Sequence, residues 1–322
     1  VITDVQSVPL TPTDYAQTVR RLQLTNGSID FRYPLDPTRR FEFSVGATRY
    51  GFGVNVREIG FNGDLSLEDV NQFLVDNNFR PLPRERETRY YGQASAAYVR
   101  DFTQMGLTSP IKGGRWRVQV TPRIGPDSYV SALADVRRYV YAKPFTFAFQ
   151  AIHVGNYGAN PSFDDRFGFG NEYLGYPYGQ GFVRGYNLRS INPRRECSPA
   201  EGAITASRCP EIDRLLGTRT ATVRAEIRLP LLGPEALAVI PFPYVPTEIA
   251  LFTDAGIAWT AENRPDLRFD TNSEATNIPV ASAGIAARVN VLGRIILEGY
   301  YARPFQRPER AGEWGLRLLP GW

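Results

Sequence analysis

Apolar and polar residues alternate with a period of two along much of this chain. The clearest run is 221–229, in which every odd position is apolar and every even position is polar. Segments 41–48, 115–121, 130–137 and 281–290 follow a similar pattern. Alternation of this kind is typical of β-strands with one apolar and one polar face. Twelve strands are therefore predicted, over 15–25, 28–35, 40–56, 87–103, 113–123, 128–142, 144–155, 218–231, 247–259, 279–291, 294–303 and 313–322.

The connections between these strands differ in length. Four of them are short and turn-like, namely Asn26-Gly27, Asp36-Pro37-Thr38, Gly125-Pro126-Asp127 and Leu292-Gly293. Others are long and cover 57–86, 156–217 and 260–278, and a short helix is expected from Ser66 to Val75. Short turns at one rim and long loops at the other are typical of a membrane β-barrel. The proline-rich stretch 231–247 is also long, and we interpret it as an ordered connection.

Two further features favour a membrane barrel over a soluble sandwich. The polar faces repeatedly carry Arg and Glu together, as a wide polar interior would. Aromatic residues gather near strand ends, where interfacial girdles lie, at Tyr139, Tyr141, Phe145, Tyr300, Tyr301 and Phe305. The predicted fold class is therefore all-β, an antiparallel transmembrane β-barrel. Lipid is expected to contact Ala221, Val223, Ala225, Ile227 and Leu229, while Arg224 and Glu226 face the lumen.

Composition narrows the chemistry. The chain has 322 residues, is 43% hydrophobic and nowhere approaches 18 consecutive apolar residues, so a helical membrane protein is excluded. Of its 37 basic residues only Lys112 and Lys143 are lysine, and no basic run suggests nucleic-acid binding. One histidine, His153, and two cysteines are too few for a multi-His or multi-Cys metal site. No cofactor motif occurs, and because His153 is expected to pack rather than to catalyse, the chain is not expected to be an enzyme.

Three segments carry a family resemblance. A long loop contains Val183, Arg184, Gly185 and Tyr186 in succession, a later strand places Phe252, Asp254 and Gly256 in a Phe-x-Asp-x-Gly pattern, and the chain ends in the segment 314–322. In order and spacing these segments resemble the barrel of the BamA/TamA outer-membrane assembly superfamily, also called the bacterial surface antigen family. The ending is most similar to members in which the barrel follows a TolB-like β-propeller. The resemblance implies an outer-membrane location and a functional loop at 183–186.

The residues themselves allow one contact of this loop. Asp254 lies on the strand face opposite the apolar one that carries Leu251, so Asp254 should point into the lumen. Arg184 lies in a glycine-flanked turn, and Gly185 allows close approach of the backbone. The residues alone favour a solvated loop arginine. With the family resemblance, Arg184 is expected to bind Asp254 or another lumenal carboxylate such as Glu226, because a guanidinium makes strong bidentate bonds to carboxylates.

Both cysteines lie in the same long loop as this motif. Cys197 and Cys209 enclose about a dozen residues, and a disulfide there would stabilise the fold by roughly 3 kcal/mol in the chain-entropy model. A disulfide fits a loop on the oxidising outer surface of a cell. We therefore predict a Cys197–Cys209 disulfide, with two free thiols as the alternative.

The resemblance also implies parts that are missing here. The family barrel has sixteen strands joined by a lateral seam between the first and the last, and we assign Pro320, Gly321 and Trp322 to the last-strand side of that seam. The twelve predicted strands leave a deficit at the N-terminal side. We interpret residues 1–322 as one barrel domain without its first strands or a periplasmic or propeller domain, and a true twelve-stranded barrel as the alternative. The start at Val1 shows no signal peptide, so we expect a removed signal or a piece of a longer chain.

By this resemblance the chain is expected to help insert or export envelope proteins or lipids, through a lateral seam and the loop 183–186, without a cofactor. The expected partners are outer-membrane lipids, client envelope proteins or lipids, and other subunits of an envelope complex, and no nucleic acid. The alternative function is a passive outer-membrane channel or a structural barrel at the cell surface.

Overall fold

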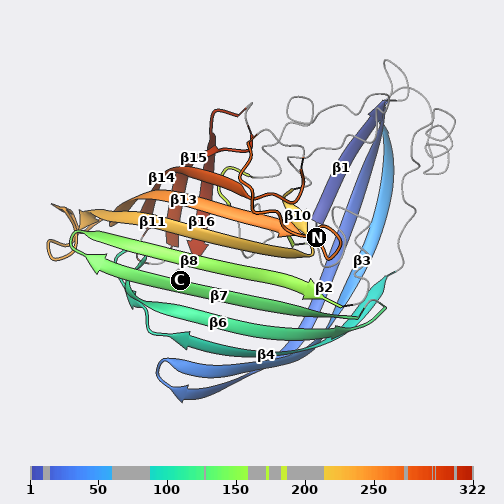
Figure 1. Cartoon of the computed structure of the whole chain (residues 1–322), viewed down its shortest axis with the longest axis horizontal. Helices are drawn as coiled ribbons and strands as arrows, with labels where there is room; N and C mark the ends of the chain where they lie inside the picture. Colours follow the sequence, from blue (N-terminus) through green and yellow to red (C-terminus); the bar gives the residue numbers. More distant parts are fainter. Residues whose placement is uncertain are drawn as a thin grey trace.

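The computed structural model describes residues 2–9, 15–59, 88–126, 128–158, 172–173, 183–186, 214–271, 275–291, 293, 295–307 and 310–320. These residues form β-strands joined by turns and loops (Figure 1). No helix in this part of the chain is long and apolar enough to cross a membrane. The alternation in the sequence suits strands, because successive side chains of a strand point to opposite faces.

Sixteen strands follow one another along the described chain. They are β1 (Ile2–Pro9), β2 (Tyr15–Asp36), β3 (Arg39–Ile59), β4 (Arg89–Asp101), β5 (Gln104–Met105), β6 (Pro110–Ile124), β7 (Tyr129–Ala142), β8 (Phe145–Tyr157), β9 (Glu172–Tyr173), β10 (Leu216–Gly217), β11 (Arg219–Gly233), β12 (Ile240–Pro241), β13 (Thr247–Trp259), β14 (Val280–Val291), β15 (Ile295–Pro304) and β16 (Glu313–Pro320).

Fourteen of these strands form one sheet. Its path runs β1-β2-β3-β4-β6-β7-β8-β11-β13-β14-β15-β16, with β5 added to β6 and β12 added to β11, while β9 and β10 form a separate pair. All neighbours on this path are antiparallel, and only the short β12 runs parallel to its partner. Figure 1 shows the sheet curling from the blue β1–β3 through β6–β8 to the red β15 and β16. Within the described residues β1 and β16 do not pair, so the curled sheet is open at these two edges.

One predicted turn is wrong. Asn26 and Gly27 lie inside β2, which continues unbroken and pairs Asn26 with Thr48 and Gly27 with Ala47 of β3. The Asn26 side chain bonds across the two strands, because its Oδ1 accepts a hydrogen bond from Thr48 Oγ1 at 3.0 Å. Pairing with β3 along the whole strand therefore outweighs the local preference of Asn-Gly for a tight turn.

The strand β1 was not predicted from the sequence. Its apolar residues Ile2, Val5 and Val8 recur at every third position, so the segment lacks the period of two. Two predicted strands merge into β2 and one unpredicted strand is added, so the path of the sheet still has twelve strands. The predicted and observed numbers of strands therefore agree only because the two errors cancel.

Other connections follow the prediction. The turn at Asp36-Pro37-Thr38 is confirmed, since Asp36 Oδ1 accepts hydrogen bonds from the backbone N–H groups of Thr38 at 2.8 Å and Arg39 at 2.9 Å. In the turn between β14 and β15, Gly293 has a φ of +71°, which a glycine adopts without strain. The stretch 231–247 is an ordered connection that contains β12, as expected. The helix expected from Ser66 to Val75 lies outside the described residues.

The two faces of the sheet carry the predicted residue types. On β11 the side chains of Val223 and Ile227 are 56% and 44% exposed, so no second sheet packs on them. Thr222, Glu226 and Arg228 alternate with them and are buried on the inner face. The exposed face is apolar and the enclosed face is polar, which is the reverse of a soluble protein and suits a barrel wall in lipid.

Candidate functional site

Residues 183–186 form a buried turn on the inner, lumenal face of the sheet. Val183, Arg184 and Tyr186 are each 1% exposed. Arg184 and Gly185 occupy the turn itself. The contacts described below attach this turn to β11, β13 and the end of β15, so it lies inside the curled sheet and not in solvent.

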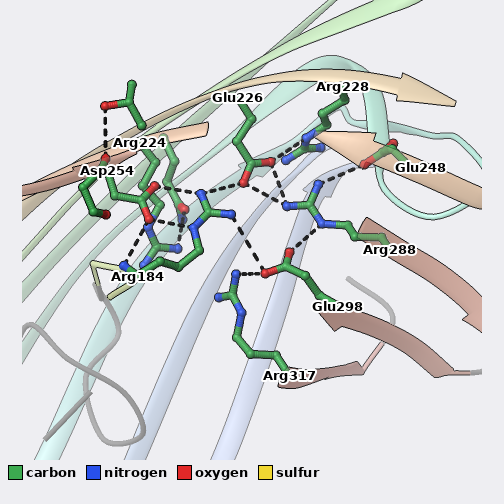
Figure 2. Close-up of polar contacts among 12 residues, drawn as sticks. Arg184, Arg224, Glu226, Arg228, Glu248, Asp254, Arg288, Glu298 and Arg317 are labelled. Atoms are coloured by element: carbon green, nitrogen blue, oxygen red, sulfur yellow. Dashed lines mark hydrogen bonds and ion pairs between the residues drawn. The ribbon is translucent and has the colours of Figure 1, made fainter. Parts of the chain in front are cut away.

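Arg184 is bound closely by carboxylates from two strands, and a third carboxylate, Glu298 of β15, lies 3.9 Å from its Nη1 (Figure 2). Its Nε and Nη2 donate to Oδ2 and Oδ1 of Asp254 on β13 at 2.7 and 2.8 Å, which makes a bidentate pair. Its Nη2 also lies 2.8 Å from Oε1 of Glu226 on β11. The backbone N–H of Arg184 donates to Asp254 Oδ2 at 3.2 Å. The predicted contact with Asp254 is therefore present, and Glu226 joins it.

Burial alone disfavours the charge of this arginine. The neighbouring Asp254, Glu226 and Glu298 more than offset that cost and raise the pKa of Arg184 above its usual value. The guanidinium therefore stays charged at any physiological pH, and the attachment of the turn does not depend on proton uptake in that range.

An aromatic ring completes the binding of the guanidinium. The Cζ of Arg184 lies 3.4 Å from the ring centroid of Phe252 on β13, a cation–π contact. Phe252 in turn meets Tyr300 of β15 edge-on, with ring centroids 6.4 Å apart. Gly256 pairs with Thr222 in the ladder between β13 and β11. Of the three residues in the Phe-x-Asp-x-Gly pattern, Phe252 and Asp254 contact the turn through their side chains, whereas Gly256 is part of the wall.

Gly185 allows the turn to approach β15. Its φ is +90°, a conformation that L side chains rarely adopt. A Cβ at this position would lie 3.3 Å from the Cβ of Ala302 and 3.4 Å from that of Pro304. The carbonyl of Gly185 accepts a hydrogen bond from Arg307 Nη1 at 2.7 Å. The positive φ therefore favours glycine here, and Ala302 leaves little space for a side chain.

Tyr186 attaches the turn to the segment after β15. Its hydroxyl donates to Gln306 Oε1 at 2.7 Å and accepts from the Gln306 backbone N–H at 3.0 Å. Gln306 Oε1 also accepts from the backbone N–H of Ala281 at 2.8 Å, which links β14 to the same contact. Burial raises the pKa of the Tyr186 hydroxyl, so it remains a protonated donor.

Further buried charges surround Arg184 on the lumenal face (Figure 2). Arg288 on β14 binds Glu226 at 2.8 Å, Glu248 of β13 at 2.9 Å and Glu298 of β15 at 2.7 Å. One guanidinium thus joins carboxylates from three other strands. Removing it would leave three buried acids with one cation fewer.

Two more arginines complete this set. Arg228 binds Glu226 on the same strand at 2.8 Å, and Arg317 of β16 binds Glu298. We call the eight residues the lumenal charge cluster: Arg184, Glu226, Arg228, Glu248, Asp254, Arg288, Glu298 and Arg317. The set has four positive and four negative side chains, and Arg224 of β11 is a further arginine beside it (Figure 2). Buried pairs contribute little net stability, but they specify which groups must meet, so the cluster fixes the loop and the last strands in one arrangement.

The sequence did not single out most of this cluster. Arg288, Glu248 and Glu298 were not predicted as site residues. Their positions in the alternation of each strand would have indicated them. Glu248 shares the strand face of Asp254, and Arg288 alternates with the outward residues of β14. Alternation indicates that such residues face the lumen but not which of them meet.

The predicted seam and disulfide are only partly covered by the structure. Pro320 is paired with Ile295 at the end of β16. Gly321, Trp322, Cys197 and Cys209 lie outside the described residues, and the seam and the disulfide stay predictions. Within the ranges that the structure describes, no group of three or more His, Cys, Asp or Glu side chains is arranged to hold a metal ion.

Comparison with known proteins agrees with this architecture. A family model described as the Omp85 superfamily domain matches residues 21–317. A search of curated proteins found no match.

Solved structures similar to this chain include BamA from Haemophilus ducreyi lacking POTRA domains 1–3, at 15% identity and a TM-score of 0.53, covering 98% of this chain and 56% of that one. CdiB from Escherichia coli is 11% identical with a TM-score of 0.53, covering 98% and 48%. CdiB from Acinetobacter baumannii is 12% identical with a TM-score of 0.50, covering 95% and 45%. The chain therefore spans about half the length of these structures and shares their barrel fold.

Proposed function

The chain belongs to the Omp85 superfamily, and from this we propose that it is the barrel part of an outer-membrane protein that inserts or exports client envelope molecules. In this proposal the barrel wall encloses the path of the client and opens at a seam, and no cofactor or covalent chemistry is involved. The fold likeness to BamA and CdiB supports this class of activity. The clients are envelope proteins or lipids, and outer-membrane lipids surround the wall.

The observation that carries the proposal is the buried attachment of Arg184. A loop that lies on the surface would make only exposed ion pairs, and such pairs contribute little stability. Here the arginine crosses to the inner wall and binds Asp254 and Glu226 at 2.7–2.8 Å. Arg184 thereby joins the turn to β11 and β13, and the contacts of Gly185 and Tyr186 join it to the end of β15, the neighbour of the C-terminal edge strand β16. We infer that it supports that edge from inside while the edge opens and closes.

The C-terminal strand is suited to opening. β16 pairs with β15 on one side, and no described strand covers its other edge. Pro320 has no backbone N–H, so the end of β16 offers one hydrogen-bond donor fewer to a partner strand. A seam with fewer hydrogen bonds separates at lower cost, which lateral insertion requires and a passive pore does not. The similarity to propeller-linked members stays a prediction.

The experiment is an insertion assay with the full-length protein in lipid vesicles. A client barrel is added unfolded, and its folding into the vesicles is followed for the parent protein, for Arg184→Ala and for Arg268→Ala. Arg268 is the matched control, because it pairs with Asp266 at 2.7 Å but is 81% exposed. We expect Arg184→Ala to slow client folding while Arg268→Ala does not.

Two results would overturn the proposal. One is a parent protein that gives no acceleration over empty vesicles while conducting ions, which would indicate a passive channel. The other is full activity of Arg184→Ala, which would remove the role of the buried attachment.

A further inference from the structure

The connection between β11 and β13 lies at the same rim as the short turns β2–β3, β7–β8 and β14–β15, which we call the short-turn rim. We call residues 234–246 the rim flap; it contains β12 and joins the two strands at their ends on the left of Figure 1. β11 extends past its neighbour β8, whose pairing with it stops at Arg228 and Thr146. The rim flap folds back against this unpaired edge, with Leu232 opposite Ile240 and Gly233 opposite Pro241. It is therefore an extension of the wall and not a free loop.

The register shows which way the rim flap faces. Leu232 pairs with Thr247 of β13 after a shift beyond Pro230. Glu248 is buried on the lumenal face, so the adjacent Thr247 points outward, and Leu232 and its partner Ile240 point outward with it. On the lumenal side the Leu107 side chain, from the turn between β5 and β6, packs against Gly233. A Cβ at Gly233 would overlap Leu107 Cδ1.

The outward side is apolar and exposed. Ile240, Phe242 and Tyr244 are 47%, 44% and 83% exposed, and the two rings contact each other with centroids 5.5 Å apart. No charged residue occurs between Glu235 and Glu248. Contiguous apolar surface of this kind marks a contact with a partner or with lipid.

Several backbone positions of the rim flap leave no N–H group free. Val239 donates its N–H to the Pro230 carbonyl at 3.0 Å, and Phe242 donates to the Gly233 carbonyl at 2.8 Å. Positions 241, 243 and 246 are prolines, which have no N–H to satisfy. Unsatisfied donors are costly in lipid, so these satisfied or missing donors lower the cost of entering the edge of a bilayer.

We propose that the rim flap is a lipid anchor that inserts Phe242 and Tyr244 into the headgroup region of the periplasmic leaflet. It continues the exposed apolar face of β11 and β13 beyond the point where β8 ends, and it places aromatic residues at the level where the interface lies. Short turns lie on the periplasmic side of outer-membrane barrels, which assigns the leaflet. The inference rests on the proposed membrane location of the barrel.

The experiment measures what surrounds Tyr244. The full-length protein is placed in lipid nanodiscs, where both faces are open to solvent, with a fluorophore on Tyr244→Cys, on Lys143→Cys or on Val223→Cys. Lys143 is an exposed residue of the neighbouring turn at the same rim, and Val223 reports the wall. The parent protein is labelled in parallel to subtract any reaction of native cysteines. Quenching is compared between nitroxide lipids and aqueous iodide.

We expect shallow nitroxide lipids to quench the label at Tyr244 at least about twofold more than the label at Lys143, and iodide to do the reverse. Equal iodide quenching at both positions would overturn the anchor, and so would protection of Tyr244 from both quenchers, which would mean that protein covers the flap. A label at Val223 that lipids do not quench would instead refute the membrane location on which the anchor rests. Tyr244 is exposed, so its substitution does not threaten folding.

Discussion

The pair between Arg184 and Asp254 can be tested by a double-mutant cycle. Arg184→Ala removes the bidentate bond to Asp254, the contact with Glu226 and the stacking on Phe252. Glu226 keeps Arg228 and Arg288 as partners. Asp254 makes no other ion pair among the described residues and its side chain is fully buried, although Arg224, directly opposite on β11, still attracts it. The cost of the variant therefore falls mainly on Asp254.

The magnitude follows from burial and distance. At an effective dielectric constant of about 20, opposite charges about 4 Å apart attract by about 4 kcal/mol. Removing one partner of a buried pair costs about 3–5 kcal/mol, because the other charge is left without compensation. The attraction between Asp254 and its cross-strand neighbour Arg224 remains in the variant and softens the loss. We therefore expect Arg184→Ala to lower the free energy of unfolding by about 3 kcal/mol.

The assay is reversible urea unfolding of the barrel in lipid vesicles, followed by tryptophan fluorescence. Asp254→Asn removes the charge with little change of shape, and the double variant lacks both charges. Because the two side chains act as one unit, the double variant should lose about 2 kcal/mol less than the sum of the single losses. Arg268→Ala should leave the unfolding midpoint unchanged, since its pair with Asp266 is exposed.

Additive losses would refute this reasoning. A coupling below about 0.5 kcal/mol would mean that the two residues do not interact in the folded barrel. A midpoint for Arg184→Ala equal to that of Arg268→Ala would mean that the buried turn is not held by this contact.

Four other variants can be measured by the same unfolding assay. Gly185→Ala should lower the free energy of unfolding by about 1–2 kcal/mol because of its positive φ, with a further loss from contact with β15. Gly293 also has a positive φ but open space around it, so Gly293→Ala should show only the first loss. Equal losses for the two variants would contradict a close approach of Gly185 to β15. Arg288→Met should lower the free energy of unfolding by about 3–5 kcal/mol, because three buried carboxylates lose a shared cation, and a loss below about 1 kcal/mol would argue against the cluster. Val223→Arg should cost about 2–4 kcal/mol if the position lies near the bilayer midplane, and an unchanged stability would place it outside lipid.

Much of the wall could be predicted from the chain alone. Alternation assigned Val223 and Ile227 to the outside and Glu226 to the inside, and the structure agrees. This works because the side-chain period of a strand is a local property that does not depend on its partners. Local signals also failed where pairing opposed them, as at Asn26 and Gly27, which a turn rule placed at a strand end and which β3 keeps within a strand.

Which residues meet across the lumen was decided only by the tertiary structure. Alternation indicates that Arg288 and Glu298 face inward, but their contact depends on the register between β14 and β15, which pairs them directly. Arg184 lies 70 positions before Asp254, and a family resemblance was needed to suggest that they meet. Register and loop placement arise from the packing of the whole sheet, where every pairing constrains the next. The sequence therefore determined the face of each side chain, and the folded sheet selected its partners.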